Sequence, residues 1–438
     1  MKNHPSPRAG RRGRPRPHPD AGFRLVWAAD TVSQAGSAVT LLALPLVAIG
    51  TLHAAPFEAA LLVTAEYLAF LLIGLPAGAW VDRMRHRTVM VAGDLVRAAL
   101  LLSVPVAAGL DALTLPQLYA VAFGMSVCTV FFDVAAQSAL PHLVDRDRLT
   151  GAHARLEATR SLTQAAGPGL GGALTVALTA PVALAADAVS YLLSALLLSR
   201  VRRSDPVPQE PPRPAGGLRA EISEGLRFVF GDRALRALTT ASAISNLCGT
   251  LGASMLLVLL AGDLGLSPLL CAAVFTAEAV GGLLGSLLTL RVAAAFGERR
   301  AMCASVLVSG VLWLLAVPFY QDDWRFAVAV ALQGLGWTAF MTFKITSVAF
   351  RQRRCPDPLL GRMTATVRFV VWGAMPVGAL VGGALGEWLG ARPAMWIGAV
   401  GELLAVLPLL LPQSAPLAMR RARACRISSV DVSGSVSS

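Results

Sequence analysis

Apolar runs long enough to cross a lipid bilayer recur along the whole of this sequence and constrain its fold more than any other feature. A membrane-spanning helix needs about 20 predominantly apolar residues. Twelve such runs can be placed, at about 24–50, 56–80, 88–109, 115–140, 159–178, 180–200, 237–261, 266–290, 299–319, 325–350, 364–386 and 392–412. Only 15% of the residues are charged, against about 25% in soluble globular chains. A single soluble domain and a disordered chain are therefore excluded, and we expect an all-α membrane protein with twelve transmembrane helices.

The segments between these runs divide the chain into parts. We expect a disordered basic cytoplasmic tail at 1–23, a six-helix half at 24–200, a cytoplasmic linker at 201–236, a second six-helix half at 237–412 and a cytoplasmic tail at 413–438. The first tail is rich in Arg and Pro and lacks the apolar core of a signal peptide. In the linker, Leu218, Ile222, Leu226 and Phe230 are spaced by four, which predicts a short amphipathic helix on the membrane surface.

Basic residues gather in alternate connecting segments, beginning with the N-terminal one. These segments hold 33 of the 38 Lys and Arg residues. Because cytoplasmic loops carry an excess of Lys and Arg, the pattern predicts an even number of helices with both termini in the cytoplasm. The net charge of +12 is thus a signal of topology, and we expect no nucleic-acid partner.

The two sets of runs share landmarks at a nearly constant spacing. The matching positions are 147–151 with 357–361, Arg160 and Pro168 with Arg368 and Pro376, and Gly78 with Gly285. Offsets of 207 to 210 residues indicate two pseudo-symmetric halves of common plan. Parallel repeats of this kind are a transporter architecture, with the substrate site between the halves near the middle of the membrane.

The loop after the second run carries a distinctive motif formed by Gly78, Asp82, Arg83 and Arg87. A small residue before the turn allows a neighbouring helix to approach closely, and the Asp and Arg groups can pair across that contact. The motif resembles the signature loop of the major facilitator superfamily, although Arg85 replaces the family's second glycine. The resemblance implies that Asp82 and Arg83 gate the cytoplasmic side. The alternative is a loop that only anchors the topology.

A glycine- and proline-rich motif lies in the fifth run and consists of Gly167, Pro168, Gly171 and Gly172. No strand or βαβ unit surrounds it, so a dinucleotide site is excluded. Within a membrane helix, Pro removes a backbone hydrogen bond and Gly allows close packing, which predicts a helix bend. The motif resembles the end of the antiporter motif of drug exporters in this superfamily, although Thr163 and Ala154 stand where that motif has glycines. A general packing kink is the alternative.

Shorter motifs extend the resemblance to one branch of the superfamily, which contains the enterobactin exporter and the macrolide-efflux permeases. They are Asp133 with 138–141, 187–190, 224–228 and 360–362. The branch implies a secondary transporter, exporting an amphipathic small molecule such as a drug, siderophore or secondary metabolite with proton coupling. An importer of the same fold and a membrane sensor or scaffold that transports nothing remain open.

Ionisable residues inside membrane spans are costly and mark functional candidates. Glu66 and Glu278 lie nearest the middle of their runs and are candidates for a proton or substrate site, or else packing residues. Asp30 and Arg368 lie nearer the cytoplasmic ends and are candidates for the same site or for the gate. Asp187, in the sixth run, is interpreted as structural.

Asp94 and Arg97 lie three residues apart in the third run, a spacing that places them on one helix face. We interpret them as a structural ion pair, with pairing to the signature loop as the alternative. The fourth run has no Arg between 118 and 130, whereas many proton-driven members of the superfamily carry one in this helix. Proton coupling therefore rests on the resemblance.

Other chemistry has little support in the sequence. The six cysteines form no CxxC pair, the six histidines form no HExxH motif, and no Walker loop is present, so we expect no metal, no cofactor and no enzymatic activity. The expected partners are the lipid bilayer, a small-molecule substrate and protons, and we expect a monomer. The Ala- and Arg-rich composition suggests the plasma (inner) membrane of a bacterium as the location.

Overall fold

A computed structural model of the chain describes residues 19–81, 83–144, 149–201, 217–356 and 359–410. These residues form helices joined by short connections, and no strand occurs among them. The all-α prediction is confirmed. Asp82, which belongs to the predicted gate, most of the two predicted tails and much of the linker lie outside the described residues.

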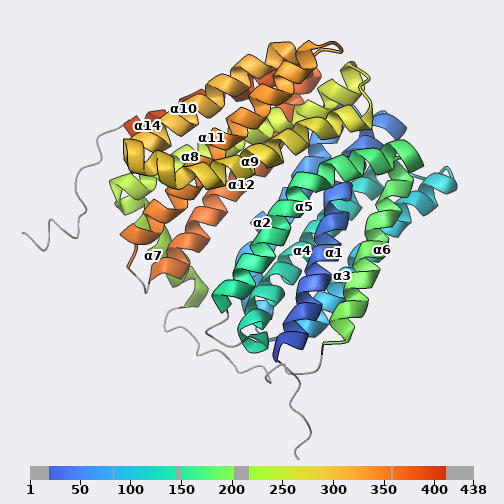
Figure 1. Ribbon diagram of the computed structural model, residues 1–438, viewed down its shortest axis with the longest axis horizontal. Coiled ribbons are helices and arrows are strands. Elements are labelled where there is room, and N and C mark those ends of the chain that lie inside the picture. The colour runs from blue at the N-terminus through green and yellow to red at the C-terminus, as the bar shows by residue number, and fades with distance from the viewer. Residues whose placement is uncertain (1–18, 82, 145–148, 202–216, 357–358, 411–438) are drawn as a thin grey trace, which may run out of the picture.

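The helices form two groups (Figure 1). The first group contains α1 (Pro19–Leu46), the π-helical turn η1 (Val47–Thr51), α2 (Pro56–Val81), α3 (His86–Gly109), α4 (Leu115–Leu143), α5 (Leu149–Leu178) and α6 (Ala180–Ser199). The second group contains α8 (Arg233–Leu257), the π-helical turn η3 (Val258–Asp263), α9 (Pro268–Phe296), α10 (Glu298–Ala316), the 3-10 turn η4 (Val317–Phe319), α11 (Arg325–Arg354), α12 (Leu360–Leu389), α13 (Ala391–Leu404) and α14 (Leu407–Leu410). Helix α7 (Gly217–Gly231) lies between the groups in the sequence.

Eleven described helices are long and apolar enough to cross a membrane, and they coincide with eleven of the twelve predicted runs. The run predicted at 159–178 is the exception, because within α5 only Ala166–Leu178 qualifies as a shorter apolar helix. The first half of α5 carries Arg155, Glu157 and Arg160, whose charges interrupt the apolar stretch. Helix α1 begins at Pro19, so the structured part starts before the predicted limit of the tail at residue 23.

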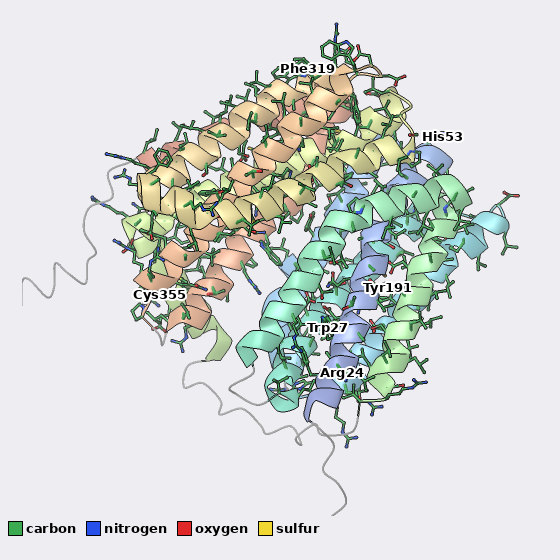
Figure 2. The ribbon with its side chains drawn as sticks, in the orientation of Figure 1. Arg24, Trp27, His53, Tyr191, Phe319 and Cys355 are labelled. Atoms are coloured by element: carbon green, nitrogen blue, oxygen red, sulfur yellow. The ribbon has the colours of Figure 1, made fainter. Side chains whose placement is uncertain are left out.

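The two ends of the helix bundle can be told apart by the residues and helices that lie there. The end with α7 also holds Arg24 and Cys355, whereas His53 and Phe319 lie at the opposite end (Figures 1 and 2). We call these the α7 end and the far end. The axes of the two groups converge at the far end and diverge toward the α7 end (Figure 1).

The two groups meet at the far end through apolar side chains. Leu42 and Ile49 of the first group belong to the same buried cluster as Met255 and Leu256 of the second. Helix α2 packs on α12, and α5 packs on α9. Small residues allow these crossings: a Cβ atom at Gly383 of α12 would lie 2.5 Å from the Cβ atom of Ala60 in α2. Close approach of small residues is the usual way in which membrane helices associate.

Candidate functional site

A cavity of about 400 Å³ lies between α2 and α12. Its walls are formed by Phe70, Leu71 and Gly74 of α2 and by Leu360, Gly361, Thr364, Ala365, Arg368, Phe369, Trp372 and Gly373 of α12. The α12 residues belong to the half of that helix nearer the α7 end. The cavity therefore occupies the region where the two groups diverge.

Aromatic rings and one guanidinium give this cavity its chemical character. The rings of Phe70 and Trp372 meet edge to face with centroids 5.0 Å apart, and the Arg368 guanidinium carbon lies 5.4 Å from the centroid of Trp372. Cation–π contact of this kind orients the Arg side chain along the wall. An apolar surface with one placed charge is suited to an amphipathic small molecule.

Arg368 lies within electrostatic reach of charged residues on the first group of helices. Asp133 of α4 lies 3.9 Å from Arg160 of α5 and interacts electrostatically with Arg368. Asp30 of α1 interacts with Arg160 and Asp133. Two of the predicted candidates, Asp30 and Arg368, are thus brought into one electrostatic neighbourhood on the α7 side of the molecule. Asp133 was not predicted as a site residue, although its position inside an apolar run was a signal that could have found it.

Glu66 lies in α2 near the cavity but is not among its lining residues. It precedes Phe70 by four residues, so the two side chains share a helix face, and Glu66 is one turn farther toward the far end. Its side chain is half-buried, and Ser126 of α4 donates a hydrogen bond to its backbone carbonyl oxygen. No ion pair of Glu66 occurs among the described residues.

Glu278 lies in a different setting, within the second group of helices. The Gln333 Nε2 atom of α11 donates a hydrogen bond of 2.8 Å to its carboxylate, and the Trp337 side chain also bonds to it. The Gln333 Oε1 atom is buried without a partner among the described residues. The structure does not join Glu278 to Glu66 by any hydrogen bond within the described ranges, so the two carboxyl groups are separate candidates.

Asp94 and Arg97 of α3 form the predicted pair, with 2.5 Å between Asp94 Oδ1 and Arg97 Nη2. Both side chains are buried. Ser194 of α6 donates a 2.6 Å hydrogen bond to Asp94, and the Arg97 guanidinium lies 4.4 Å from the ring centroid of Tyr191. Figure 2 shows Tyr191 inside the first group. The pair therefore joins α3 to α6.

Asp187 of α6 is fully buried against α1. Thr40 and Ser190 donate hydrogen bonds to its carboxylate, and a Cβ atom at Gly36 would lie 2.1 Å from Asp187 Oδ1. A glycine is thus needed for α1 to pass this carboxyl group. The polar positions Ser33, Ser37 and Thr40, spaced by three or four along an otherwise apolar run, were an available signal for this contact.

The second group holds a comparable buried carboxyl group, which was not among the predicted site residues. Glu402 of α13 is 4% exposed and accepts a 2.7 Å hydrogen bond from Ser245 of α8. In both groups, therefore, a buried carboxyl group on the last long helix bonds to a hydroxyl group on the first.

The predicted gate loop is described in part. Gly78 lies near the end of α2, and Arg83 is exposed. Arg85 has φ −74° and ψ 111°, an extended conformation that needs no glycine, which explains how Arg replaces Gly there. Arg87 donates hydrogen bonds to the carbonyl oxygen atoms of Leu198, at 3.1 Å, and Ser199. It thereby satisfies carbonyl groups at the end of α6 and ties α3 to α6 within the first group.

The predicted bend motif lies in α5, with Pro168 inside the helix, and Figure 1 shows that α5 changes direction before its end. Its glycines serve two different contacts. Gly167 and Gly171 face α1, where a Cβ atom at Gly167 would lie 2.1 Å from the Cβ atom of Ala38. Gly172 faces α9 of the other group, where its Cβ atom would lie 2.6 Å from that of Ala272.

Apolar helices of spanning length, arranged in two groups around a largely apolar cavity with one charged residue in its wall, define a multi-pass membrane transporter. The chain belongs to the transmembrane secretion effector family of the major facilitator superfamily, whose sequence profile matches residues 16–425. It is 27% identical over 401 residues to the multidrug efflux pump Tap of Mycolicibacterium fortuitum, covering 89% of this chain and 95% of that protein.

Solved structures share the fold at low sequence identity. The nucleoside transporter NupG superposes with a TM-score of 0.72 at 12% identity, over 89% of this chain and 99% of that one. A bacterial homologue of the iron transporter ferroportin superposes with a TM-score of 0.69 at 16% identity in its inward-facing state, over 89% and 98% of the two chains. In its outward-facing state the same coverage gives a TM-score of 0.58 at 17% identity.

Proposed function

We propose that this secondary transporter exports an amphipathic small molecule from the cytoplasm by alternating access between its two groups of helices. The observation that carries the proposal is the cavity between α2 and α12, whose aromatic walls and single Arg368 guanidinium suit an amphipathic molecule. Similarity to a multidrug efflux pump along nearly the whole chain supports the direction of transport.

In this proposal the chain has twelve spans in two pseudo-symmetric halves. They are the eleven helices that are long and apolar enough to cross a membrane, together with α5. Its apolar half, Ala166–Leu178, would cross the outer part of the membrane, while its charged half faces the divergent region that contains Arg160 and Asp133. The placement of Pro168 in α5 and Pro376 in α12, two helices that each contact the other group, supports the symmetry.

The α7 end would be cytoplasmic, with both termini on that side. Support comes from the arginines that the fold collects at this end, among them Arg83, Arg200, Arg353 and Arg362, since cytoplasmic loops carry excess basic residues. The structure would then represent the inward-facing state. The closer superposition on the inward-facing ferroportin homologue supports this assignment. The location would be a bacterial plasma membrane, with the protein acting as a monomer.

Coupling to protons is the energy source in this proposal, with Glu66 or Glu278 as the carrier. A carboxyl group without an ion-pair partner in a membrane span can bind and release a proton as its exposure changes. Asp82 and Arg83 would gate the cytoplasmic side by joining the two halves in the outward-facing state. Asp30 and Arg368 would change partners during the same movement.

The experiment that tests this function measures cellular accumulation of a panel of labelled amphipathic compounds in an efflux-deficient bacterium, with and without the protein and with and without a protonophore. Export predicts lower accumulation that the protonophore restores. Higher accumulation would contradict export and indicate uptake. Unchanged accumulation across a broad panel, with the protein present in the membrane, would contradict export of this class of compound.

A further inference from the structure

Helix α7 packs directly on α12 at the α7 end of the second group. Val229 of α7 is fully buried and shares a cluster with Cys355, Met363 and Val367. Leu226 and Phe230, which were predicted to lie on the membrane-facing side of this helix, are 38% and 36% exposed, and their contact with the membrane surface stays a prediction. The apolar side chain that α7 buries against α12 is therefore Val229, one residue away from the predicted stripe.

A close backbone approach fixes the position of α7 on α12. A Cβ atom at Gly225 would lie 2.4 Å from the Thr366 side-chain oxygen and 2.9 Å from the Arg362 carbonyl oxygen. Beside this contact, Glu224 forms an ion pair with the Arg362 guanidinium. Because both charged side chains are partly exposed, the ion pair contributes little energy, and the close packing is the stronger constraint.

The motifs 224–228 and 360–362, which carry part of the family resemblance, are thus two sides of one contact.

The same stretch of α12 presents its other side to the cavity. Gly361, Thr364, Ala365 and Arg368 line the cavity, and their spacing by three or four places them on one face of the helix. Met363 and Val367 contribute to the cluster with α7. One short segment of α12 is therefore a cavity wall on one face and a docking surface for α7 on the other.

Helix α7 is also anchored to the rest of the second group. Asp232, the residue after α7, accepts hydrogen bonds from the backbone N–H groups of Ala234 and Leu235, at 2.8 and 3.1 Å, and so caps α8. Its other oxygen forms a 3.1 Å ion pair with Arg354 of α11. Through Asp232 and Val229, α7 connects the ends of α8, α11 and α12.

We propose that α7 is a strut that positions the cavity wall formed by α12, and that Gly225 is a positioning residue for transport although it lies outside the cavity. This inference rests on the proposed transport function. Because α7 holds α8, α11 and α12 together, the cytoplasmic part of the second group moves as one body when the cavity closes. A displaced α7 would leave Arg368 and Thr364 wrongly placed in the cavity.

The test is the substitution Gly225→Ala, with Gly231→Ala as the matched control. Gly231 lies on the same helix and has open space around its Cβ position, so it reports the effect of a methyl group without a clash. We expect Gly225→Ala to lower the maximal transport rate about five- to tenfold, within the usual range of coupling between distant sites, and Gly231→Ala to have no effect. The double variant Gly225→Ala with Thr366→Ala should recover only part of the rate, because it removes the closest atom but leaves the Arg362 carbonyl oxygen 2.9 Å from the new Cβ atom.

A second readout separates positioning from loss of folding and does not depend on a substrate. A cysteine replacing Thr364, in a background without the native cysteines, is labelled with a membrane-impermeant maleimide in inverted vesicles. Gly225→Ala should change its labelling rate, and added Thr366→Ala should restore that rate in part, at equal amounts of monodisperse protein. Labelling and transport equal to those of the parent would overturn the inference, as would a loss of transport that only follows a loss of folded protein. If the parent itself exports nothing, the proposed function fails. The labelling result still tests whether α7 positions the cavity wall, because it needs no substrate.

Discussion

Glu66 and Glu278 share a position in the interior of membrane spans but differ in what holds their side chains. Glu278 is fixed by Gln333 and Trp337, whereas no side-chain hydrogen bond of Glu66 occurs among the described residues. A fixed carboxyl group with a hydrogen-bond partner is better suited to bind one ligand in one geometry. Glu278 is therefore the stronger candidate for proton binding, and Glu66, beside the cavity ring of Phe70, is the stronger candidate for substrate contact.

The substitution Glu278→Gln separates these roles. The amide keeps an oxygen that accepts the Gln333 hydrogen bond but cannot bind and release a proton, so packing is preserved while coupling is lost. We expect protonophore-sensitive export to fall by about five- to 150-fold, the usual range of coupling between two ligands, with thermal stability unchanged. The measurement is transport into inverted vesicles under an imposed pH gradient, with Glu66→Gln alongside. Full pH-driven transport by Glu278→Gln would exclude Glu278 as the carrier.

Gly172 offers a steric prediction at the contact between the two groups. A Cβ atom there would lie 2.6 Å from that of Ala272 and 2.9 Å from the carbonyl oxygen of Pro268. Overpacking of this kind typically costs about 1–3 kcal/mol, so Gly172→Ala should depopulate the state with a closed far end by about five- to 150-fold.

The measurement is maleimide labelling, from outside the cell, of a cysteine replacing Ile49 at the far end in a background without the native cysteines. Labelling should increase in Gly172→Ala. The matched control is Gly169→Ala, whose Cβ atom would make an ordinary contact of 3.7 Å with Thr276. Equal labelling of the two variants would contradict the idea that α5 and α9 close this end.

Sequence patterns located the charged candidates but not most of their partners. The spacing of Asp94 and Arg97 was sufficient to predict their pairing, because residues three apart on a helix meet. Asp133 and Arg160 lie on different helices, and Ser245 and Glu402 lie on the first and last long helices of the second group. No local sequence pattern predicts contact within either pair. Only the packing of helices brings Arg368 within electrostatic reach of Asp133 across the two groups.

The buried Asp94–Arg97 pair contributes to the attachment of helix α3 to α6. Removal of one partner leaves an uncompensated buried charge, which costs about 3–5 kcal/mol, whereas replacing both by apolar residues is often close to neutral. We therefore expect Asp94→Leu to lower the melting temperature of the purified protein markedly, and Asp94→Leu with Arg97→Met to recover most of the loss. Thermal unfolding in detergent measures this. Equal destabilisation by the double variant would indicate that the pair has a further structural role through Tyr191 or Ser194.

Helix positions followed closely from the apolar runs, since a membrane demands a fixed length of apolar chain. The predicted runs at 88–109 and 180–200 correspond to α3 (His86–Gly109) and α6 (Ala180–Ser199). Helix α5 was less well predicted because it extends to Leu149 through a charged segment. That segment keeps helical geometry beside the divergent region, where charges need not meet lipid. The docking of α7 on α12 could not be predicted from the sequence, because it depends on the close approach of Gly225 to Thr366 and Arg362.

Transport by alternating access requires the two groups of helices to move relative to each other. In this structure the far end is closed by apolar contacts between α1, α2 and η1 on one side and α8 and η3 on the other. Alternating access requires these contacts to separate while the cavity between α2 and α12 closes. A covalent link across the far end should therefore stop transport, whereas a link within one group should not.

A disulfide between cysteines replacing Ala60 of α2 and Gly383 of α12 makes this link. The Cβ atoms of these positions lie 2.5 Å apart, against about 3.8 Å in a disulfide, so the helices need to separate only slightly. In a background without the native cysteines, oxidation should abolish export and a reductant should restore it. The matched control joins cysteines replacing Gly285 of α9 and Met341 of α11, two positions of the second group whose Cβ atoms would lie 2.9 Å apart, and its oxidation should leave export intact. Export by the oxidised Ala60–Gly383 variant, with the cross-link verified by mass spectrometry, would show that the far end does not open, and movement of the two groups as separate bodies would then be excluded.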